Sequence, residues 1–167
     1  MTNSAQEGRQ KVRAIILKTG VGILTTIDGD GQFVSRPMLA LLLDDDPGVY
    51  FLTHTSSAKV GQIAAQSRVA LTFIGPDSAY LSVVGRASPL QDAALVAHLW
   101  NPTYRAWFPD GVGDPDVTVL RVAVDRADYW EAPTSRVVRL IEAVAAIVTH
   151  TPYETPKTTV EEPEPPK

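Results

Sequence analysis

The stretch GVYFLTHTSSAKVGQI, residues 48–63, predicts the local structure around which the rest of the chain is organised. Its first half, residues 49–53, is β-branched, aromatic and apolar, which is typical of a buried strand. Its second half carries hydroxyl side chains at Thr55, Ser56 and Ser57, followed by Lys59 and apolar residues at helical spacing. We therefore expect a strand, a polar turn and the start of a helix.

The start of this helix has two possible roles. A helix N-terminus exposes unpaired backbone N–H groups and the positive end of the helix dipole, and the hydroxyls and the Lys59 ammonium would add to a phosphate site there. Alternatively, Ser56 or Ser57 simply caps the helix and Lys59 is a solvated residue of the first turn. The local residues alone favour capping and leave phosphate binding open.

Composition excludes several classes of function. The 167 residues suit one domain, expected at residues 1–149, with a disordered tail rich in Pro and Glu at 150–167. The net charge is −4 and there is no basic stripe, which disfavours nucleic-acid binding. There are no cysteines, and the three histidines are not spaced along the sequence as metal ligands usually are, so no metal site is predicted. No apolar run approaches the ~20 residues of a membrane span, and we expect a cytoplasmic protein.

The remaining sequence predicts short strands with few helices between them. A capping box at residues 4–7 should begin a first helix that ends at Gly20, and further helices are expected at 89–108 and 134–148. Strands are predicted at residues 21–27, 32–43, 49–53, 68–74, 79–87 and 117–130. This order favours a mainly β fold with peripheral helices (α+β), a closed or split antiparallel barrel of six to seven strands.

Two positions inside the predicted strands need an explanation. Arg36-Pro37-Met38 places a charge before a residue that cannot donate to a ladder, so this segment should lie at an edge or a bulge. Arg36 could be a solvated edge charge or could point at a ligand. Gly85 should mark a bulge or a close backbone approach.

Several segments, taken together and in order, resemble the pyridoxamine 5′-phosphate oxidase-like FMN-binding split-barrel proteins, and most closely their general stress protein branch. They span roughly residues 12 to 140. The matching segments are Gly22-Ile23-Leu24-Thr25-Thr26, Ser35-Arg36-Pro37-Met38, Tyr50-Phe51-Leu52-Thr53 with Ser57-Ala58-Lys59, Val84-Gly85-Arg86-Ala87, Leu99-Trp100-Asn101-Pro102, residues 106–111 with Asp114-Pro115, and Tyr129-Trp130-Glu131-Ala132-Pro133.

The resemblance implies a homodimer with two flavin sites, each formed by both chains at the interface. It implies that Arg36, Pro37 and Met38 lie along the flavin. It also implies that Thr53, Ser57 and Lys59 hold the ribityl chain and phosphate, with His54 and Thr55 as adjacent candidates. The aromatic candidates for the partner's site are Trp100, Trp107 and Trp130.

The function implied is an FMN-dependent oxidoreductase linked to the stress response, for which no catalytic side chain is assigned. The alternatives are a non-catalytic flavin-binding or sensing protein, or the same fold using FAD, a deazaflavin or haem. Only Arg136 and Arg139 resemble the substrate-phosphate residues of true pyridoxamine phosphate oxidases, so oxidation of vitamin B6 is not expected. A hydrolase is excluded because no nucleophile elbow or Ser, His and Asp pattern is present.

Overall fold

The structure is a computed structural model that describes residues 2–75, 79–131 and 157–161. The helices are α1 (Thr2–Thr19), α2 (Ala58–Ala65), α3 (Ala93–Leu99) and the 3-10 helix η2 (Pro102–Ala106). The strands are β1 (Val21–Ile27), β2 (Phe33–Leu39), β3 (Leu41–Leu42), β4 (Val49–His54), β5 (Arg68–Ile74), β6 (Ala79–Leu90), β7 (Val117–Glu131) and β8 (Lys157–Glu161).

One antiparallel sheet contains all the strands, in the order β2-β1-β5-β6-β7-β4-β3, and β8 also pairs with β7. The two ends of this path, β2 and β3, are consecutive in the chain, so the sheet curls toward closure. The backbone N–H of Ala40, between them, donates to the carbonyl of Gly20 at 2.9 Å instead of to a strand. The predicted single strand at 32–43 is therefore wrong, because the chain changes ladders there. The predicted split barrel is confirmed.

The organising strand β4 is buried along its length, as its apolar sequence predicts. Its alternate side chains enter two hydrophobic clusters, because successive residues of a strand point to opposite faces. Val49 and Phe51 lie in the barrel core, whereas Tyr50 and Leu52 pack with residues of α3, η2 and the start of β7. The end of β4 is thus fixed from both sides.

The long strands β6 and β7 carry the bulge predicted at Gly85. The register between them shifts between Val84 and Gly85. A Cβ atom at Gly85 would collide with the carbonyl oxygen of Ala123 on β7. The prediction of a close backbone approach is therefore confirmed. Arg36-Pro37-Met38 lies in β2, an edge of the sheet, as also predicted.

Two strands pair with the edge of β7 that lies opposite β6. β4 pairs with its first part, from Val117 to Val122, and β8 pairs with its last part, from Arg126 to Trp130. The disordered tail predicted for 150–167 is thus wrong for residues 157–161, which form β8. Asp128 accepts hydrogen bonds from Arg126 and Thr159 and pairs with Lys157, which ties this strand down.

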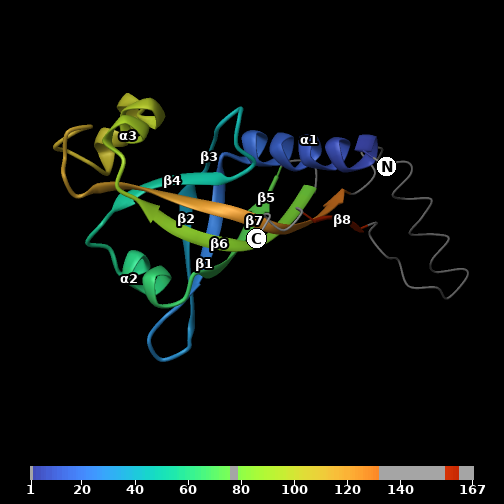
Figure 1. The fold of residues 1–167 in the computed structure, drawn as a ribbon, viewed down its shortest axis with the longest axis horizontal. Helices are drawn as coiled ribbons and strands as arrows, with labels where there is room; N and C mark the ends of the chain where they lie inside the picture. The colour runs from blue at the N-terminus through green and yellow to red at the C-terminus, as the bar shows by residue number, and fades with distance from the viewer. Residues whose placement is uncertain (1, 76–78, 132–156, 162–167) are drawn as a thin grey trace, which may run out of the picture.

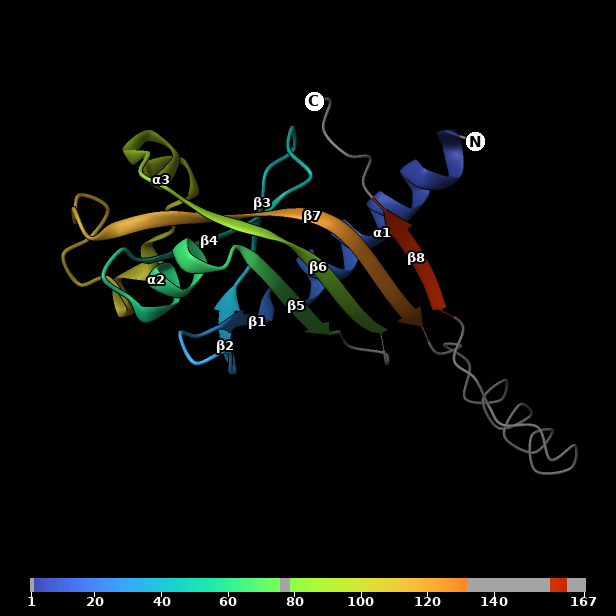
Figure 2. The same cartoon turned by 60° about the horizontal axis from the view of Figure 1, so that its bottom comes forward.

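The helices lie toward opposite ends of the sheet (Figure 1). Both views place α1 and β8 together at one end and α2 and α3 toward the other (Figure 2). α1 ends as predicted, since Gly20 has a positive φ of 71° and its N–H donates to the carbonyl of Ile16. It begins at Thr2, so the predicted start at Ser4 is wrong.

The predicted helix at 89–108 is much shorter in the structure. Pro89 and Leu90 still belong to β6, and α3 begins only after Asp92, whose carboxylate accepts from the N–H of Leu95. Asn101 then caps the separate 3-10 helix η2, which has a proline in its first turn. The helix predicted at 134–148 lies outside the described residues. Within the described part, no helix is long and apolar enough to cross a membrane.

Candidate functional site

A cavity of about 470 Å³ opens where β2, the end of β4, the start of α2 and η2 meet. It brings together six of the site residues predicted from the sequence: Pro37, Met38, Thr53, His54, Lys59 and Trp107. The other lining residues are Val21, Leu39, Leu52, Tyr104 and Phe108. The cavity therefore has mainly apolar and aromatic walls and a polar end at the turn between β4 and α2.

The polar end is a chain of hydroxyls and one ammonium. Lys59 Nζ donates to Thr53 Oγ1 at 3.0 Å, and Thr53 Oγ1 lies 3.3 Å from Ser57 Oγ. Thr53 is only 4% exposed. Ser57 occupies the N-cap position of α2, yet its side chain makes no capping hydrogen bond, and the Ser56 hydroxyl donates to Asp116. Ser57 is therefore the N-cap residue by position, as the capping interpretation has it, but its hydroxyl does not cap the helix.

Two cations lie at this end without a carboxylate to balance them. Burial lowers the pKa of Lys59, and the positive charge of Arg36 lowers it further. Burial also lowers the pKa of Arg36. Among the described residues no ion pair involves either side chain. A bound anion would offset both charges, which is the electrostatic condition for a phosphate site.

Arg36 is behind the cavity wall and does not line it. Its guanidinium donates to Thr26 Oγ1 at 2.6 Å and to Gln62 Oε1 at 2.9 Å, with a longer contact to the Leu24 carbonyl. Thr26 in turn donates to Gln62 at 2.6 Å. These interactions tie β2 to β1 and α2. No local sequence pattern indicates Thr26 or Gln62 as site residues, because their connections to Arg36 span 10 and 26 residues.

His54 joins the end of β4 to the segment after η2. Its Nε2 lies 3.2 Å from the carbonyl oxygen of Trp107, and its Nδ1 lies 3.2 Å from Asp116 Oδ2. Its ring packs against Phe108, with centroids 4.7 Å apart. Asp116, which precedes β7, was not predicted as a site residue, and the partners of its side chain are about 60 positions away in the chain.

Asp116 also organises the turn before α2. It accepts from both the backbone N–H and the hydroxyl of Ser56, at 2.9 and 2.6 Å. The pKa of its carboxyl is lowered, first by the Ser56 hydroxyl and then by the Ser56 N–H, with a smaller effect of His54. Thr55 faces this loop as well, since its N–H donates to the Asp116 carbonyl and its hydroxyl accepts from Gln91. Thr55 does not line the cavity.

The three tryptophans lie in different environments. Trp107 lines the cavity and is 58% exposed. Trp100 packs against Tyr104 and Phe108 in the second core, with ring centroids 5.9 and 6.0 Å away. Trp130 lies near the other end of β7 from the part that pairs with β4, and it is not among the residues that line the cavity. One chain therefore does not bring Trp130 to this cavity.

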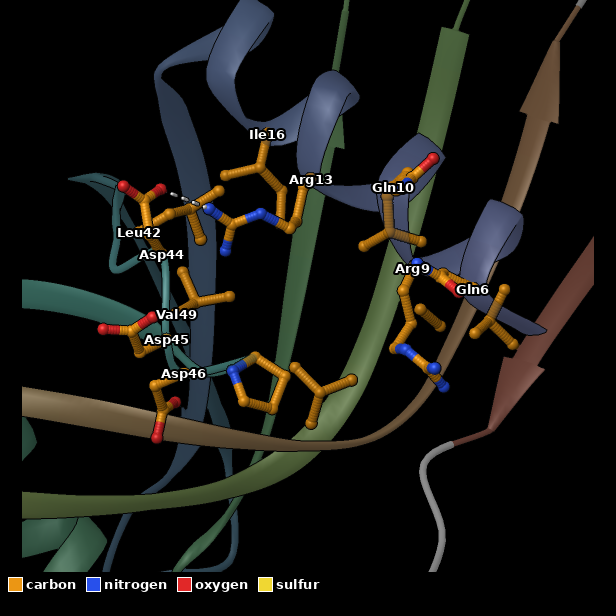
Figure 3. Close-up of a pocket in the computed structure, with 15 residues that line it drawn as sticks. Gln6, Arg9, Gln10, Arg13, Ile16, Leu42, Asp44, Asp45, Asp46 and Val49 are labelled. Carbon is orange, nitrogen blue, oxygen red and sulfur yellow. Dashed lines mark hydrogen bonds and ion pairs between the residues drawn. The ribbon is translucent and has the colours of Figure 1, made fainter. Parts of the chain in front are cut away.

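A second cavity, of about 340 Å³, lies under α1 (Figure 3). Arg9 and Arg13 of α1 face the acidic loop of Asp44, Asp45 and Asp46 across it, and Arg13 pairs with Asp44. It contains none of the residues predicted for the flavin site. The described residues include no group of three or more His, Cys, Asp or Glu side chains that could hold a metal ion.

Comparison with known proteins agrees with this architecture. The family model described as "Pyridoxamine 5′-phosphate oxidase like" matches residues 7–154. The chain therefore belongs to the pyridoxamine 5′-phosphate oxidase-like family, which confirms the resemblance found in the sequence.

Similar solved structures come from general stress proteins. General stress protein 26 of Bacillus anthracis is 26% identical, with a TM-score of 0.65 over 72% of this chain and 92% of that one. The general stress FMN/FAD binding protein of Xanthomonas citri is 27% identical, with a TM-score of 0.68 over 78% and 92%. Protein bli-3 of Neurospora crassa is 27% identical over 141 residues, which cover 78% of this chain and 68% of that protein.

Proposed function

We propose that this protein binds FMN in the cavity between β2, β4, α2 and η2 and acts as a flavin-dependent oxidoreductase of the stress response. The observation that carries the proposal is the pair of cations, Lys59 and Arg36, for which the described residues supply no carboxylate, beside the hydroxyls of Thr53 and Ser57. The family and the flavin-binding general stress protein of Xanthomonas citri support the same ligand.

The residues present fit a phosphorylated flavin. A phosphate monoester carries nearly two negative charges, and Lys59 would bind it directly while Arg36 supports it electrostatically from behind. The N-terminus of the eight-residue helix α2 adds its dipole to the same end. The apolar wall formed by Pro37, Met38 and Trp107 would receive the ring. When bound, the flavin supplies the electron-transfer chemistry, and the chain supplies binding, orientation and exclusion of water.

We further propose that the cavity is completed by a second copy of the chain. Beside the cavity, the outer face of the sheet exposes apolar side chains at Val21, Ile23 and Phe33, of which Phe33 is 78% exposed. On the same sheet, Ile74 and Tyr80 face each other on β5 and β6 and are 64% and 46% exposed. Exposed apolar side chains of this size favour association. Tyr80 pairs with Trp130 in the sheet, so an interface at this face would have Trp130 beside it.

The first test is an absorption spectrum of the purified protein, followed by titration of the apoprotein with FMN, FAD and a deazaflavin. Flavin bands with a preference for FMN are expected. A colourless protein that binds none of these ligands would refute the flavin site, and a preference for the deazaflavin would identify that molecule as the cofactor instead of FMN. Tight FMN binding without turnover of nicotinamide donors would favour the alternative of a non-catalytic flavin-binding protein.

The homodimer has a separate test by light scattering after size-exclusion chromatography. Ile23→Glu places a charge in the exposed apolar face beside the cavity and should give monomers. Leu17→Glu is the control, because Leu17 is 66% exposed but lies on α1. A wild-type monomer, or an Ile23→Glu variant that stays dimeric, would exclude this interface.

A further inference from the structure

His54 lies between two hydrogen-bond acceptors. One is the carbonyl oxygen of Trp107, which can only accept a hydrogen bond and lies 3.2 Å from His54 Nε2. The other is Asp116 Oδ2, 3.2 Å from Nδ1. Because hydrogen bonds from Ser56 lower the pKa of the Asp116 carboxyl, this group is also an acceptor only at neutral pH.

Only the protonated ring satisfies both acceptors. A neutral imidazole carries one N–H and can donate either to Trp107 or to Asp116, whereas the imidazolium donates to both. Histidine is also the side chain that ordinarily changes charge between pH 5 and 8. The arrangement of His54 between Asp116 and Trp107 is therefore one in which a protonated ring makes one more hydrogen bond than either neutral tautomer.

The contact with Trp107 controls an exposed part of the cavity wall. Trp107 lies between two buried anchors, Tyr104 and Phe108, which are 5% and 4% exposed, whereas Trp107 itself is 58% exposed. Within the described residues, His54 is the side chain that holds the Trp107 peptide to β4. The Trp107 N–H donates to the Tyr104 carbonyl, and the two rings have centroids 6.4 Å apart. Loss of the hydrogen bond to His54 would therefore remove the contact of Trp107 with β4 and leave its contacts with Tyr104.

We propose that His54 is a proton-dependent latch that holds Trp107 against the cavity and thereby strengthens ligand binding. The part of the proposal that concerns the ligand rests on the proposed function, whereas the part that concerns Trp107 does not. The charged groups on the neighbouring elements are Asp116, in the loop before β7, and Lys59 of α2, which lines the same cavity as His54. Tyr104, on η2, has a pKa raised by burial and stays neutral. As the pH rises and His54 loses its proton, the latch opens.

The latch can be tested on the apoprotein. Quenching of tryptophan fluorescence by acrylamide, a neutral quencher, should increase between pH 5.5 and pH 8 as Trp107 is released. Trp107→Phe should abolish the change, which assigns it to that side chain. His54→Gln, which keeps a polar side chain without a titrating group, should remove the pH dependence. Asp116→Asn should move the transition to lower pH, because the charged ring loses its carboxylate partner. A flat wild-type profile, or an unchanged transition in His54→Gln, would overturn the proposal.

The effect on the ligand is measured by FMN titration at pH 5.5 and pH 8 in both wild type and His54→Gln. The phosphate of FMN also titrates near pH 6, but it does so equally with both proteins, so the comparison cancels it. The ratio of the dissociation constants, pH 8 over pH 5.5, should be about threefold to tenfold larger for wild type, the range of one hydrogen bond. Equal ratios would overturn the link to binding. A fluorescence transition in a protein that binds no flavin would refute the proposed function and leave the latch intact.

Discussion

The ammonium of Lys59 lies 3.0 Å from the hydroxyl of Thr53, the last buried side chain of β4 before the turn into α2. The contact places a cation of the first turn of α2 over the end of the organising strand. Because Thr53 is buried and Ser57 lies beside its hydroxyl, Lys59 is held at the polar end of the cavity and does not extend into solvent. The turn between β4 and α2 therefore positions the charge on which the proposed phosphate site depends.

Lys59→Ala should weaken FMN binding while the fold is retained. A charged hydrogen bond contributes about 1.5–3 kcal/mol, so the dissociation constant should rise about tenfold to a hundredfold. Binding of riboflavin, which lacks the phosphate, should change much less. Lys18→Ala is the matched control, since it removes the same charge from an exposed position on α1. Equal FMN affinities of wild type and Lys59→Ala, measured by fluorescence titration, would exclude the phosphate assignment.

Thr26→Val should destabilise the protein although the two side chains have nearly the same shape. Thr26 is fully buried, accepts from Arg36 and donates to Gln62. Without its hydroxyl, the half-buried guanidinium of Arg36 loses its closest acceptor, and Gln62 loses a donor, at a cost of about 1–3 kcal/mol in the free energy of unfolding. Urea denaturation measures this change. Thr72→Val is the control on an exposed strand position and should stay within about 0.5 kcal/mol of wild type.

The sequence predicted the elements whose signals are local. The apolar run in β4, the turn after β1 and the glycines at positions 20 and 85 each carry their structural reason within a few residues, and these predictions are confirmed. The break at Ala40 depends on a hydrogen bond to Gly20, and β8 depends on pairing with β7. Those partners are distant in the chain, so the sequence pattern did not reveal them.

The candidate site shows the same division. Ser57 and Lys59 lie in the hydroxyl-rich turn that the local sequence pattern singled out, and the resemblance added Thr53 beside them. The resemblance added Pro37, Met38 and Trp107, which line the same cavity. Asp116 was missed because the surrounding aspartates of the loop predict only a turn, and its role follows from contacts with Ser56 and His54.

Gly85→Val should strongly destabilise the protein, because a Cβ atom at this bulge meets the backbone carbonyl of Ala123, which cannot move aside as a side chain would. We expect a loss of more than about 2 kcal/mol in the free energy of unfolding and a lower melting temperature. Gly61→Ala is a control in which the added Cβ atom meets no other atom, so the opposite effect on stability is expected. Gly61 lies within α2 and has open space around its Cβ position, so alanine should stabilise by about 0.5–1 kcal/mol. A Gly85→Val variant that melts like wild type would contradict the close approach.

The ion pair between Asp46 and Arg121 should make part of the stability depend on pH. Burial alone would raise the pKa of Asp46, but the hydrogen bonds from Arg121 and from the Gly48 N–H outweigh it, and the net shift is downward from 3.8. A depressed folded-state pKa stabilises the protein above the unfolded pKa, and this contribution is lost as the pH falls through the folded value. Both side chains are about 30% exposed, so solvent screening limits the contribution to about 1 kcal/mol or less.

Asp46→Asn tests this contribution by urea denaturation at pH 7 and below pH 3.8. The variant should be less stable than wild type at pH 7, and the difference should shrink in acid, where Asp46 of the wild type becomes protonated. Asp45→Asn removes the same charge from an exposed position of the same loop and should show no such convergence. If the difference between wild type and Asp46→Asn stays constant with pH, the pair between Asp46 and Arg121 does not stabilise the fold through its charge.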